Sequence, residues 1–577
     1  MAKRVLAIVA AAGVVILGAL VALRPARGVP DGAPTLEEMA DDVGSQLMLN
    51  LWRGHVPGRS AEIMLVPRPH RFLIGEWDLT TLGTAAPDIS TSHPNPWNYL
   101  ARVPIIAYGP GYAPSGKVQE RPVDIGSIAP TYAELLGMDG LEFDAEPLGE
   151  ILEGAPSRRP KVIFTVVIDG GGWNALQQHS SAWPTIDGLM KRGTTYVNAN
   201  IGSAPSITGA IHATFGTGTY PITHGVPGNQ MRGPDGKNTD TWLQNADPRY
   251  LDAPTVSELW DEQNDNKPFV GIVSFEGWHL GMIGHGAQTE GGDRDVAVLW
   301  EAQDSAWWIN EDFYELPEYL QPTDLGMLES YEEDLDARDG LTDGTWYGHT
   351  LDLLQEPLAR PTTPAFVRFT GDAVVEVMRR ERVGRDDLTD LFWVEMKTPD
   401  FAGHAYNVVS PEEEDVLRET DRQIARYVRE LDRTVGRGNY LFVISADHGQ
   451  QPLPETAGGW RINNRELGRD IEARFGNIVE KETPVDIYFD MEAVADENVD
   501  LADVARYIGT YTIGENIPDG APGANRVPDG RLDELLFAGA FTTDYFESLS
   551  VGEIQSFGDS AYEEGDLTIP FDRDDGR

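Results

Sequence analysis

The clearest pattern in the chain is a set of short, continuous apolar runs that end abruptly in polar residues. Three of them are Lys161–Asp169, Leu391–Met396 and Tyr440–Ala446. Runs with no polar alternation are typical of strands in a parallel sheet that is covered on both faces. Ahead of the third run, apolar residues recur at helical spacing, at Val416, Thr420, Ile424, Tyr427, Val428 and Leu431. Alternating strands and helices predict an α/β fold, with a mainly parallel central sheet and helices on both faces.

The segment before the first run contains a similar but shorter series of elements. Its pattern predicts a helix near Leu36–Leu51, strands at Glu62–Pro69 and Val103–Gly111, and a helix from Asp124 to Gly137. Residues 151–160 contain Gly, two Pro and a Ser-Arg-Arg step, which is typical of a linker. We therefore predict a segment at 30–150 joined by a linker at 151–160 to the main part of the protein.

The main part, 161–577, is predicted to be catalytic and to carry an insertion. From about 230 to 390 the chain is rich in Trp and acidic residues, with one clear strand at Phe269–Ser274. We interpret this range as partly sheet and largely an inserted cap. The remainder, from 455, has weaker patterns and ends in an acidic tail.

The N-terminus reads as a targeting segment. Two basic residues, Lys3 and Arg4, precede an almost wholly apolar stretch from Val5 to Leu23. That length is about enough to span a bilayer, and the preceding charges favour a cytoplasmic N-terminus. We predict a signal anchor in residues 1–28, or a cleaved signal peptide as the alternative. In both cases the body of the protein is expected to be extracytoplasmic, attached to the cell membrane unless the segment is cleaved.

Composition narrows the chemistry. Acidic residues exceed basic ones by 93 − 45 = 48 over 577 residues, which argues against binding nucleic-acid duplexes through their phosphates. Such an acidic chain suits a high-salt environment, where screening weakens its self-repulsion. The chain has no cysteine, so disulfides, Cys nucleophiles and thiolate metal sites are excluded. Any metal must be held by His and carboxylates.

Carboxylates follow all three apolar runs. They are Asp169, Asp400 and Asp447, and two of them have imidazoles nearby at His404 and His448. Parallel strands end at the same edge of a sheet, so these side chains are expected to converge. Two Asp–His pairs and a third Asp are enough to hold two divalent cations about 3.5–4 Å apart, and zinc accepts this set of N and O ligands. Such two-metal sites act on phosphoryl groups.

A nucleophile is expected where a loop turns into a helix, in the stretch around SITGAIHATF. A helix N-terminus offers free N–H groups and a positive dipole end to a phosphate oxygen. Three hydroxyl residues stand there, Ser203, Ser206 and Thr208. Residue chemistry alone does not choose among them.

Residues 161–450 resemble the alkaline phosphatase superfamily, in particular its type I phosphodiesterase/nucleotide pyrophosphatase branch. The matching motifs are VVIDG, TGAIHATFGTGTYPITHGVPGN, PDFAGH and SADHG, in the family's order. The resemblance implies that Thr208 is the nucleophile and that Asn229 contacts a non-bridging phosphate oxygen. It also implies two Zn²⁺, or other divalent cations. One would be held by Asp169, Thr208, Asp447 and His448, the other by Asp400 and His404. His212 and His224 match motif histidines that look structural.

The resemblance leaves one ligand to find. The family's second metal takes a further His downstream of the D-H-G motif, and this chain has no His after His448. The family's C-terminal pattern stands instead near the N-terminus, as EIMLVPRP, SHPNPWNY, VPIIAYGPG and DIGSIAPTYAELLG. We therefore predict a circular permutation in which residues 30–150 correspond to the family's C-terminal part and His93 is the missing ligand.

These observations predict a two-zinc phosphohydrolase that cleaves small phosphate esters through a covalent phosphothreonine. Phosphodiester or pyrophosphate bonds are favoured, because no assured Lys or Arg stands at the site to meet the extra charge of a monoester. The alternatives are a phosphomonoesterase, a transferase of phospho-headgroups onto envelope glycans or lipids, and a binding protein on an inactive scaffold. Measurements of bound metal and of turnover would distinguish an inactive binding protein from the enzymes.

Overall fold

The computed structural model describes residues 28–74, 91–138, 140–153, 158–242, 245–351 and 359–562. The predicted membrane segment, Val5–Leu23, lies outside the described residues, as do the centre of the predicted linker and the end of the acidic tail. Within the ranges described, no helix is both long and apolar enough to cross a bilayer.

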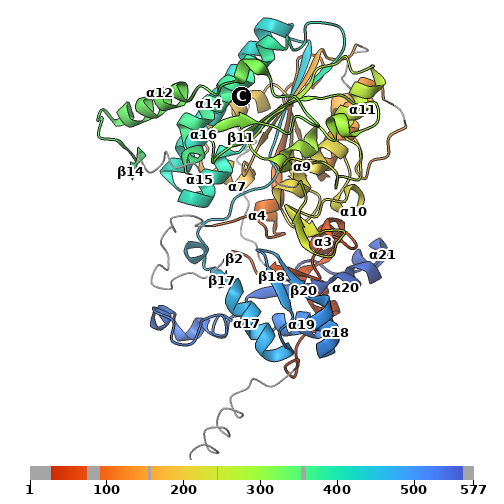
Figure 1. Ribbon diagram of the computed structural model, residues 1–577, viewed down its shortest axis with the longest axis vertical. Coiled ribbons are helices and arrows are strands. Elements are labelled where there is room, and N and C mark those ends of the chain that lie inside the picture. Colours follow the sequence, from red (N-terminus) through yellow and green to blue (C-terminus); the bar gives the residue numbers. More distant parts are fainter. Residues whose placement is uncertain are drawn as a thin grey trace, which may run out of the picture.

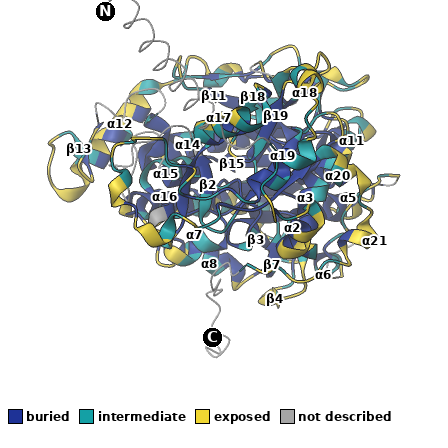
Figure 2. Ribbon diagram, turned by 90° about the horizontal axis from the view of Figure 1, so that it is seen from below, coloured by how far each residue is buried: buried dark blue, intermediate teal, exposed yellow. Residues whose placement is uncertain are grey.

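A ten-stranded sheet forms the centre of the larger part of the molecule, in the order β12-β11-β10-β15-β6-β16-β3-β7-β4. Its short strand β4 (Lys117–Gln119) is at one edge, and β5 (Val123–Asp124) also pairs with β7. Five neighbouring strands in the middle run parallel: β11 (Val296–Glu301), β10 (Val270–Val273), β15 (Asp390–Met396), β6 (Val162–Ile168) and β16 (Tyr440–Ser445). The three apolar runs are therefore adjacent parallel strands, and the prediction of a mainly parallel central sheet is confirmed. Figure 2 shows the strands in dark blue, because their residues are buried.

Helices cover both faces of this sheet (Figure 1). One layer contains α14 (Pro364–Arg380), α15 (Thr398–Tyr406) and α16 (Pro411–Leu431), which pack on one another. The other contains α5 (Ile128–Leu136), α9 (Thr208–Thr217) and α11 (Val256–Gln263). Predicted helices are recovered in both layers, and Gly137 ends α5 in the left-handed conformation (φ 66°).

The range predicted as a cap contributes more strands to the central sheet than the one that was expected. Its strands β10, β11 and β12 (Ala306–Trp308) complete one side of the central sheet. Parts of the same range project outward, namely α12 (Leu325–Asp336) and the hairpin of β13 (Thr345–Trp346) and β14 (His349–Thr350) (Figure 1).

A smaller unit is built from both ends of the chain. Its four-stranded sheet has the order β18-β19-β1-β20. The strand β1 (Ile63–Pro67) lies between β19 (Asp486–Phe489) and β20 (Phe537–Thr542), antiparallel to each, and β18 (Val479–Glu482) is at the edge. The helices around it are α2 (Leu36–Val43), α17 (Asn464–Phe475) and α19 (Leu501–Ile508). The single helix expected near Leu36–Leu51 is two, because Gly44 (φ 90°) separates α2 from α3 (Ser45–Gly54).

The segment predicted to be permuted spans both parts. Its strand β3 (Arg102–Tyr108) lies in the central sheet between β16 and β7 (Thr194–Asn200), antiparallel to both. The loop that carries His93 precedes β3 and the short helix α4 (Asn98–Ala101). This placement brings the N-terminal segment to the same edge of the sheet as the three strand ends.

Candidate active site

The turn after β6 and the loop after β16 are in direct backbone contact, so closely that a side chain at Gly172 would not fit. The Gly172 N–H donates to the His448 carbonyl (2.8 Å), and a Cβ on Gly172 would lie 2.5 Å from the Cα of Gly449. Gly170 has φ 72°, a conformation that glycine adopts without strain, and its N–H donates to Asp447 Oδ1 (3.1 Å). The glycines of the V-V-I-D-G-G-G and D-H-G motifs thus permit the approach of the two carboxylates.

Asp169, Asp447 and His448 form a first group of candidate ligands. His448 Nε2 lies 3.2 Å from Asp169 Oδ1 and 3.2 Å from Asp447 Oδ2. All three side chains are fully buried. Because Asp169 ends β6 and the other two follow β16, the group depends on these strands being parallel neighbours.

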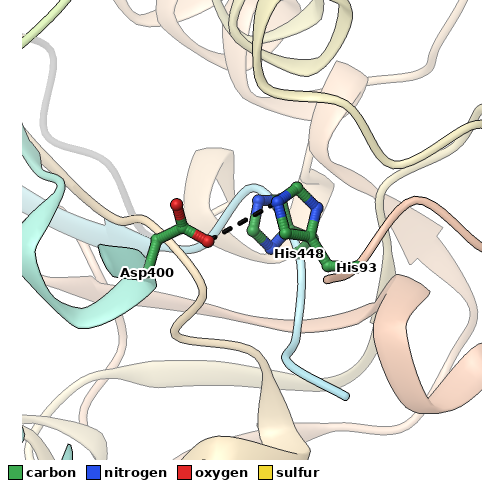
Figure 3. Close-up of side chains that lie close together, drawn as sticks. All are labelled: His93, Asp400 and His448. Atoms are coloured by element: carbon green, nitrogen blue, oxygen red, sulfur yellow. Dashed lines mark ion pairs between the residues drawn. The ribbon is translucent and has the colours of Figure 1, made fainter. Parts of the chain in front are cut away.

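Asp400, His404 and His93 form a second group beside the first. Asp400 and His404 are one turn apart on α15, and His404 Nε2 lies 3.2 Å from Asp400 Oδ1. His93 Nε2 lies 3.5 Å from the same oxygen. Figure 3 shows the Asp400 carboxylate pointing toward the rings of His93 and His448, which stack with their centroids 3.4 Å apart. The structure therefore brings His93 to the residues with which it was predicted to act.

Backbone carbonyls fix the tautomer of all three histidines. The Nδ1–H groups of His93, His404 and His448 donate to the carbonyls of Ser206 (2.8 Å), Thr91 (2.6 Å) and Gly449 (2.9 Å). A carbonyl only accepts, so Nδ1 carries a proton, and in the neutral imidazole the lone pair is on Nε2. In each case Nε2 is the nitrogen that faces the carboxylates. Metal-ligating histidines are commonly oriented by such a hydrogen bond from the other nitrogen.

The two groups fit divalent metal ions. Four of their ligand-type atoms are buried and have no hydrogen-bond partner among the described residues: Asp169 Oδ1, Asp400 Oδ1, Asp447 Oδ2 and His448 Nε2. When zinc binds its ligands at about 2.0–2.2 Å in a tetrahedron, the ligand atoms lie about 3.3–3.5 Å from one another. The distances between the histidine Nε2 atoms and the carboxylate oxygens given above are 3.2–3.5 Å. Unpaired buried acceptors are costly, and a cation would satisfy them.

Lys397 was not among the predicted site residues; its place three residues before Asp400 suggested contact with a substrate oxygen no more strongly than a solvated side chain. Its Nζ is 2.7 Å from Asp169 Oδ2 and 2.7 Å from Asp400 Oδ2, so it joins the two groups through the carboxylate oxygens that His448, His404 and His93 do not face. Burial opposes the charge of this ammonium, but the two carboxylates outweigh burial and raise the pKa of Lys397 well above its usual value. Lys397 in turn helps to hold the pKa of Asp169 well below its usual range despite burial. The position of Lys397, one turn before Asp400, was the available signal.

A further buried cluster, also missed, lies behind the first group. Glu395 interrupts the apolar strand β15, and its carboxylate lies between His212 (3.6 Å) and His279 (3.8 Å). His279 Nδ1 accepts the Glu276 N–H (3.0 Å), so Nε2 carries the proton and faces Asp169 Oδ2 at 3.7 Å. His279 is therefore a donor toward Asp169 and not a ligand in this tautomer. A charged residue inside an apolar strand was the signal that could have found this cluster.

Thr208 and Asn229 lie together at the start of α9. Thr208 is the first residue of the helix, and Asn229 Oδ1 accepts the N–H of Gly209 (2.9 Å). His212, one turn on, donates Nδ1–H to the Thr208 carbonyl (2.8 Å), and this Nδ1 is 3.9 Å from Asp447 Oδ2. These contacts place the N-terminus of α9 next to the first group. His224 is buried, and its Nδ1 accepts the N–H of Val226.

Comparisons with known proteins point to one group of phosphate-ester hydrolases. The family model for type I phosphodiesterase / nucleotide pyrophosphatase matches residues 163–525. Alkaline phosphatase PafA of Elizabethkingia meningoseptica is 25% identical over 426 residues, which cover 61% of this chain and 73% of that protein. Alkaline phosphatase PhoV of Synechococcus elongatus is 21% identical over 413 residues, covering 62% and 73%.

The crystal structure of wild-type PafA matches with a TM-score of 0.52 and 20% identity, covering 67% of this chain and 85% of that one. This likeness is one of fold. The family model spans more than half of the chain, and the range that it matches contains the strand-end carboxylates and the start of α9 described above. The chain belongs to the type I phosphodiesterase / nucleotide pyrophosphatase family of the alkaline phosphatase superfamily and is a phosphoric ester hydrolase.

Proposed function

We propose that this protein is an extracytoplasmic two-zinc phosphohydrolase that forms a covalent phosphothreonine on Thr208. The observation that carries the proposal is the pair of adjoining ligand groups at the sheet edge, with three histidines whose free Nε2 atoms face carboxylates. Asp169, Asp447 and His448, with Thr208, would hold one ion, and Asp400, His404 and His93 the other. When bound, the ions would supply the positive charge that lowers the pKa of a hydroxyl and stabilises a leaving oxygen.

The residues of the chain supply the remaining chemistry. The Thr208 hydroxyl gives up its proton and Oγ1 attacks phosphorus; the bond to the leaving oxygen breaks, and that oxygen departs with the electron pair and takes up a proton from solvent. Water then cleaves the phosphothreonine and restores the hydroxyl. The N-terminus of α9 directs its dipole at the phosphate, and Asn229 is oriented by its bond from Gly209, so that its amide N–H groups can donate to a non-bridging oxygen.

Diester or pyrophosphate bonds are the favoured substrates. The one lysine within the ligand groups, Lys397, is buried and engaged by two carboxylates, so it is not available to the second negative charge of a monoester. The apolar stretch Val5–Leu23 supports attachment to the outer side of a membrane.

The nucleophile assignment is tested with three variants. Thr208→Ala should abolish turnover of chromogenic phosphate esters and leave the metal content above one ion per chain. Ser203→Ala and Ser206→Ala are the matched controls, because both hydroxyls precede the same helix, and the Ser206 hydroxyl donates to the Asn95 carbonyl (3.1 Å). Acid quenching followed by mass spectrometry should find an adduct on the wild-type peptide containing Thr208: one phosphoryl group with a monoester substrate, and one phosphoryl group that keeps its second ester group with a diester. Turnover by Thr208→Ala, or a phosphoryl group on another residue, would overturn the assignment.

A further inference from the structure

Three aspartates gather at the edge of the central sheet opposite the candidate active site. Asp261 is in the last turn of α11, and Asp293 and Asp295 belong to the loop that leads into β11. One carboxylate oxygen from each lies within 4.8 Å of those from the other two. Asp295 precedes a parallel strand, whereas Asp169 and Asp447 come after theirs. The cluster is therefore about one strand length, on the order of 20 Å, from the catalytic carboxylates.

The cluster is largely enclosed by protein. Asp261 and Asp295 are 4% and 7% exposed, whereas Asp293 is open to solvent. Asp261 Oδ1 is buried and has no hydrogen-bond partner among the described residues. The carboxyl group that carries this oxygen faces two further carboxylates. A buried acceptor in such a position is costly unless a cation or a proton meets it.

No positive side chain of the described ranges pairs with the three aspartates. Arg294 stands between two of them in the sequence, but its guanidinium donates to the Glu311 carbonyl (3.1 Å). Lys267, after the helix, pairs with Asp265 (2.7 Å). Helix α11 has no basic residue in its last turn, so the negative end of its dipole adds to the charge of the cluster. The cluster thus has an excess of negative charge that a bound cation would offset.

The backbone around the cluster is held by contacts that do not use its carboxylates. The Asn266 side-chain amide donates to the Gly291 carbonyl (2.8 Å) and joins the turn after α11 to the loop. The Asp295 carbonyl accepts the Glu315 N–H (2.9 Å). Burial, reinforced by the charge of the neighbouring carboxylates, raises the pKa of Asp261 to about 8. The fold therefore holds the carboxylates together against their mutual repulsion.

The oxygen ligands and their spacing favour calcium. Carboxylate and water oxygens suit Ca²⁺, Mg²⁺ and Mn²⁺, whereas zinc sites usually include nitrogen or sulfur. Mg–O bonds of about 2.0–2.1 Å limit two ligand oxygens to about 4.2 Å apart, while Ca–O bonds of about 2.3–2.6 Å allow about 5 Å. Oxygens within 4.8 Å of one another fit the calcium sphere. The exposed side of Asp293 leaves room for the water molecules that would complete it.

We propose that Asp261, Asp293 and Asp295 bind one calcium ion, which joins α11 to the start of β11 and stabilises the inserted side of the central sheet. Helix α11 also packs on α9, so the ion would support the layer of helices that carries Thr208. The inference goes beyond the proposed function and does not depend on it, because the two sites share no residue.

Calcium uptake by the zinc-loaded protein tests the site directly. In equilibrium dialysis the wild type should bind about one calcium ion per chain more than Asp261→Asn or Asp293→Asn, with a dissociation constant on the order of 10⁻⁴ M. Any calcium at the catalytic carboxylates persists in these variants and cancels in the comparison. Glu290→Gln is the matched control, since it removes an exposed carboxylate from the same loop and should bind calcium as the wild type does.

Thermal unfolding separates loss of the ion from damage to the fold. Calcium at about 5 mM should raise the melting temperature of the wild type and of Glu290→Gln by about 2 °C, and magnesium should have a clearly smaller effect. Asp261→Asn keeps the shape of the side chain and relieves repulsion. Without calcium this variant should melt no lower than the wild type, and calcium should not raise its melting temperature. Asp293→Asn, at an exposed position, should show the same lack of response.

The contrary results are equally definite. Equal calcium uptake by the wild type and the two cluster variants would overturn the inference. So would a rise in melting temperature that magnesium reproduces, or one that Asp261→Asn and Asp293→Asn retain, because general screening of an acidic surface would then explain the effect. Absence of phosphate-ester hydrolysis would refute the proposed function and leave the calcium measurements unaffected.

Discussion

His93 reaches the site from a loop that precedes every other candidate ligand in the chain. The loop is attached to the active-site edge by several hydrogen bonds. The Thr91 hydroxyl donates to the Gln451 carbonyl (2.8 Å), and the Thr91 carbonyl accepts from His404. The Gly449 N–H donates to the Leu100 carbonyl (2.7 Å), just after the loop. The orientation of His93 is thus set by backbone contacts with both ligand groups.

Replacing His93 should remove the metal ion from one candidate position and leave the ion at the other. We expect His93→Ala to lower bound zinc from about two ions per chain to about one, with a loss of activity on the order of 10²-fold. His349→Ala, in the outlying β13–β14 hairpin, is the matched control and should keep both ions. Metal analysis after dialysis makes the measurement. Two tightly held ions in His93→Ala would show that His93 is not a ligand.

Lys397 balances the charge of the carboxylates when no metal is bound. Lys397→Met keeps the length of the side chain and leaves Asp169 and Asp400 buried without this partner. Breaking a buried ion pair from one side costs about 3–5 kcal/mol, so the metal-free variant should unfold at a clearly lower urea concentration. Zinc should recover most of the loss, because the ions would neutralise the same carboxylates. A deficit of equal size with and without zinc would contradict this role.

Strands β6, β15 and β16 could be predicted because a strand buried on both faces is apolar along most of its length, and this pattern is local. The strand-end carboxylates followed from the same pattern. The sheet of the smaller unit could not be predicted in the same way. Its strand β1 pairs with β19 and β20, which lie more than 400 residues later, and the edge strand β18 has three consecutive charged residues, Glu480, Lys481 and Glu482. Likewise, the contacts of Lys397 and His279 with Asp169 are tertiary and leave no periodic signal.

Helix α12 is attached to the rest of the molecule by a buried ion pair. Arg360, after the helix, makes a two-bond contact with Glu332 on α12, Nε to Oε1 (2.8 Å) and Nη2 to Oε2 (2.9 Å). Both side chains are less than a tenth exposed. Such bidentate pairs are directional and specific, and removal of one charge leaves the other without compensation.

Glu332→Gln should therefore lower the free energy of unfolding by about 3 kcal/mol. The matched control is Glu329→Gln, because Glu329 is exposed on the same helix and its replacement should change stability by less than about 0.5 kcal/mol. Urea denaturation of the two variants measures the difference. If Glu332→Gln cost no more than Glu329→Gln, the ion pair would not be what attaches α12.

Strands from the N-terminal and C-terminal parts of the chain pair in one sheet. The start of the chain supplies β1 to the smaller unit and β3 to the catalytic sheet, while the family model matches from residue 163 onward. The circular permutation remains a prediction, and this arrangement is the one that it requires. Its functional consequence is that the loop of His93 is positioned by N-terminal residues.

The net charge of −48 acts on the molecule as a whole. Unpaired surface carboxylates repel one another in the compact state more than in the unfolded chain, and salt shortens the range of this repulsion from about 10 Å at 0.1 M to about 3 Å at 1 M. We expect the melting temperature of the zinc-loaded protein to rise by roughly 5 °C or more between 0.1 and 1 M NaCl. Sodium sulfate at equal ionic strength is the control, since screening predicts a similar rise, whereas a general strengthening of apolar burial predicts a much larger one with sulfate. A melting temperature independent of NaCl would mean that the excess charge is already compensated within the fold, and the expectation of a high-salt environment would then have no physical basis.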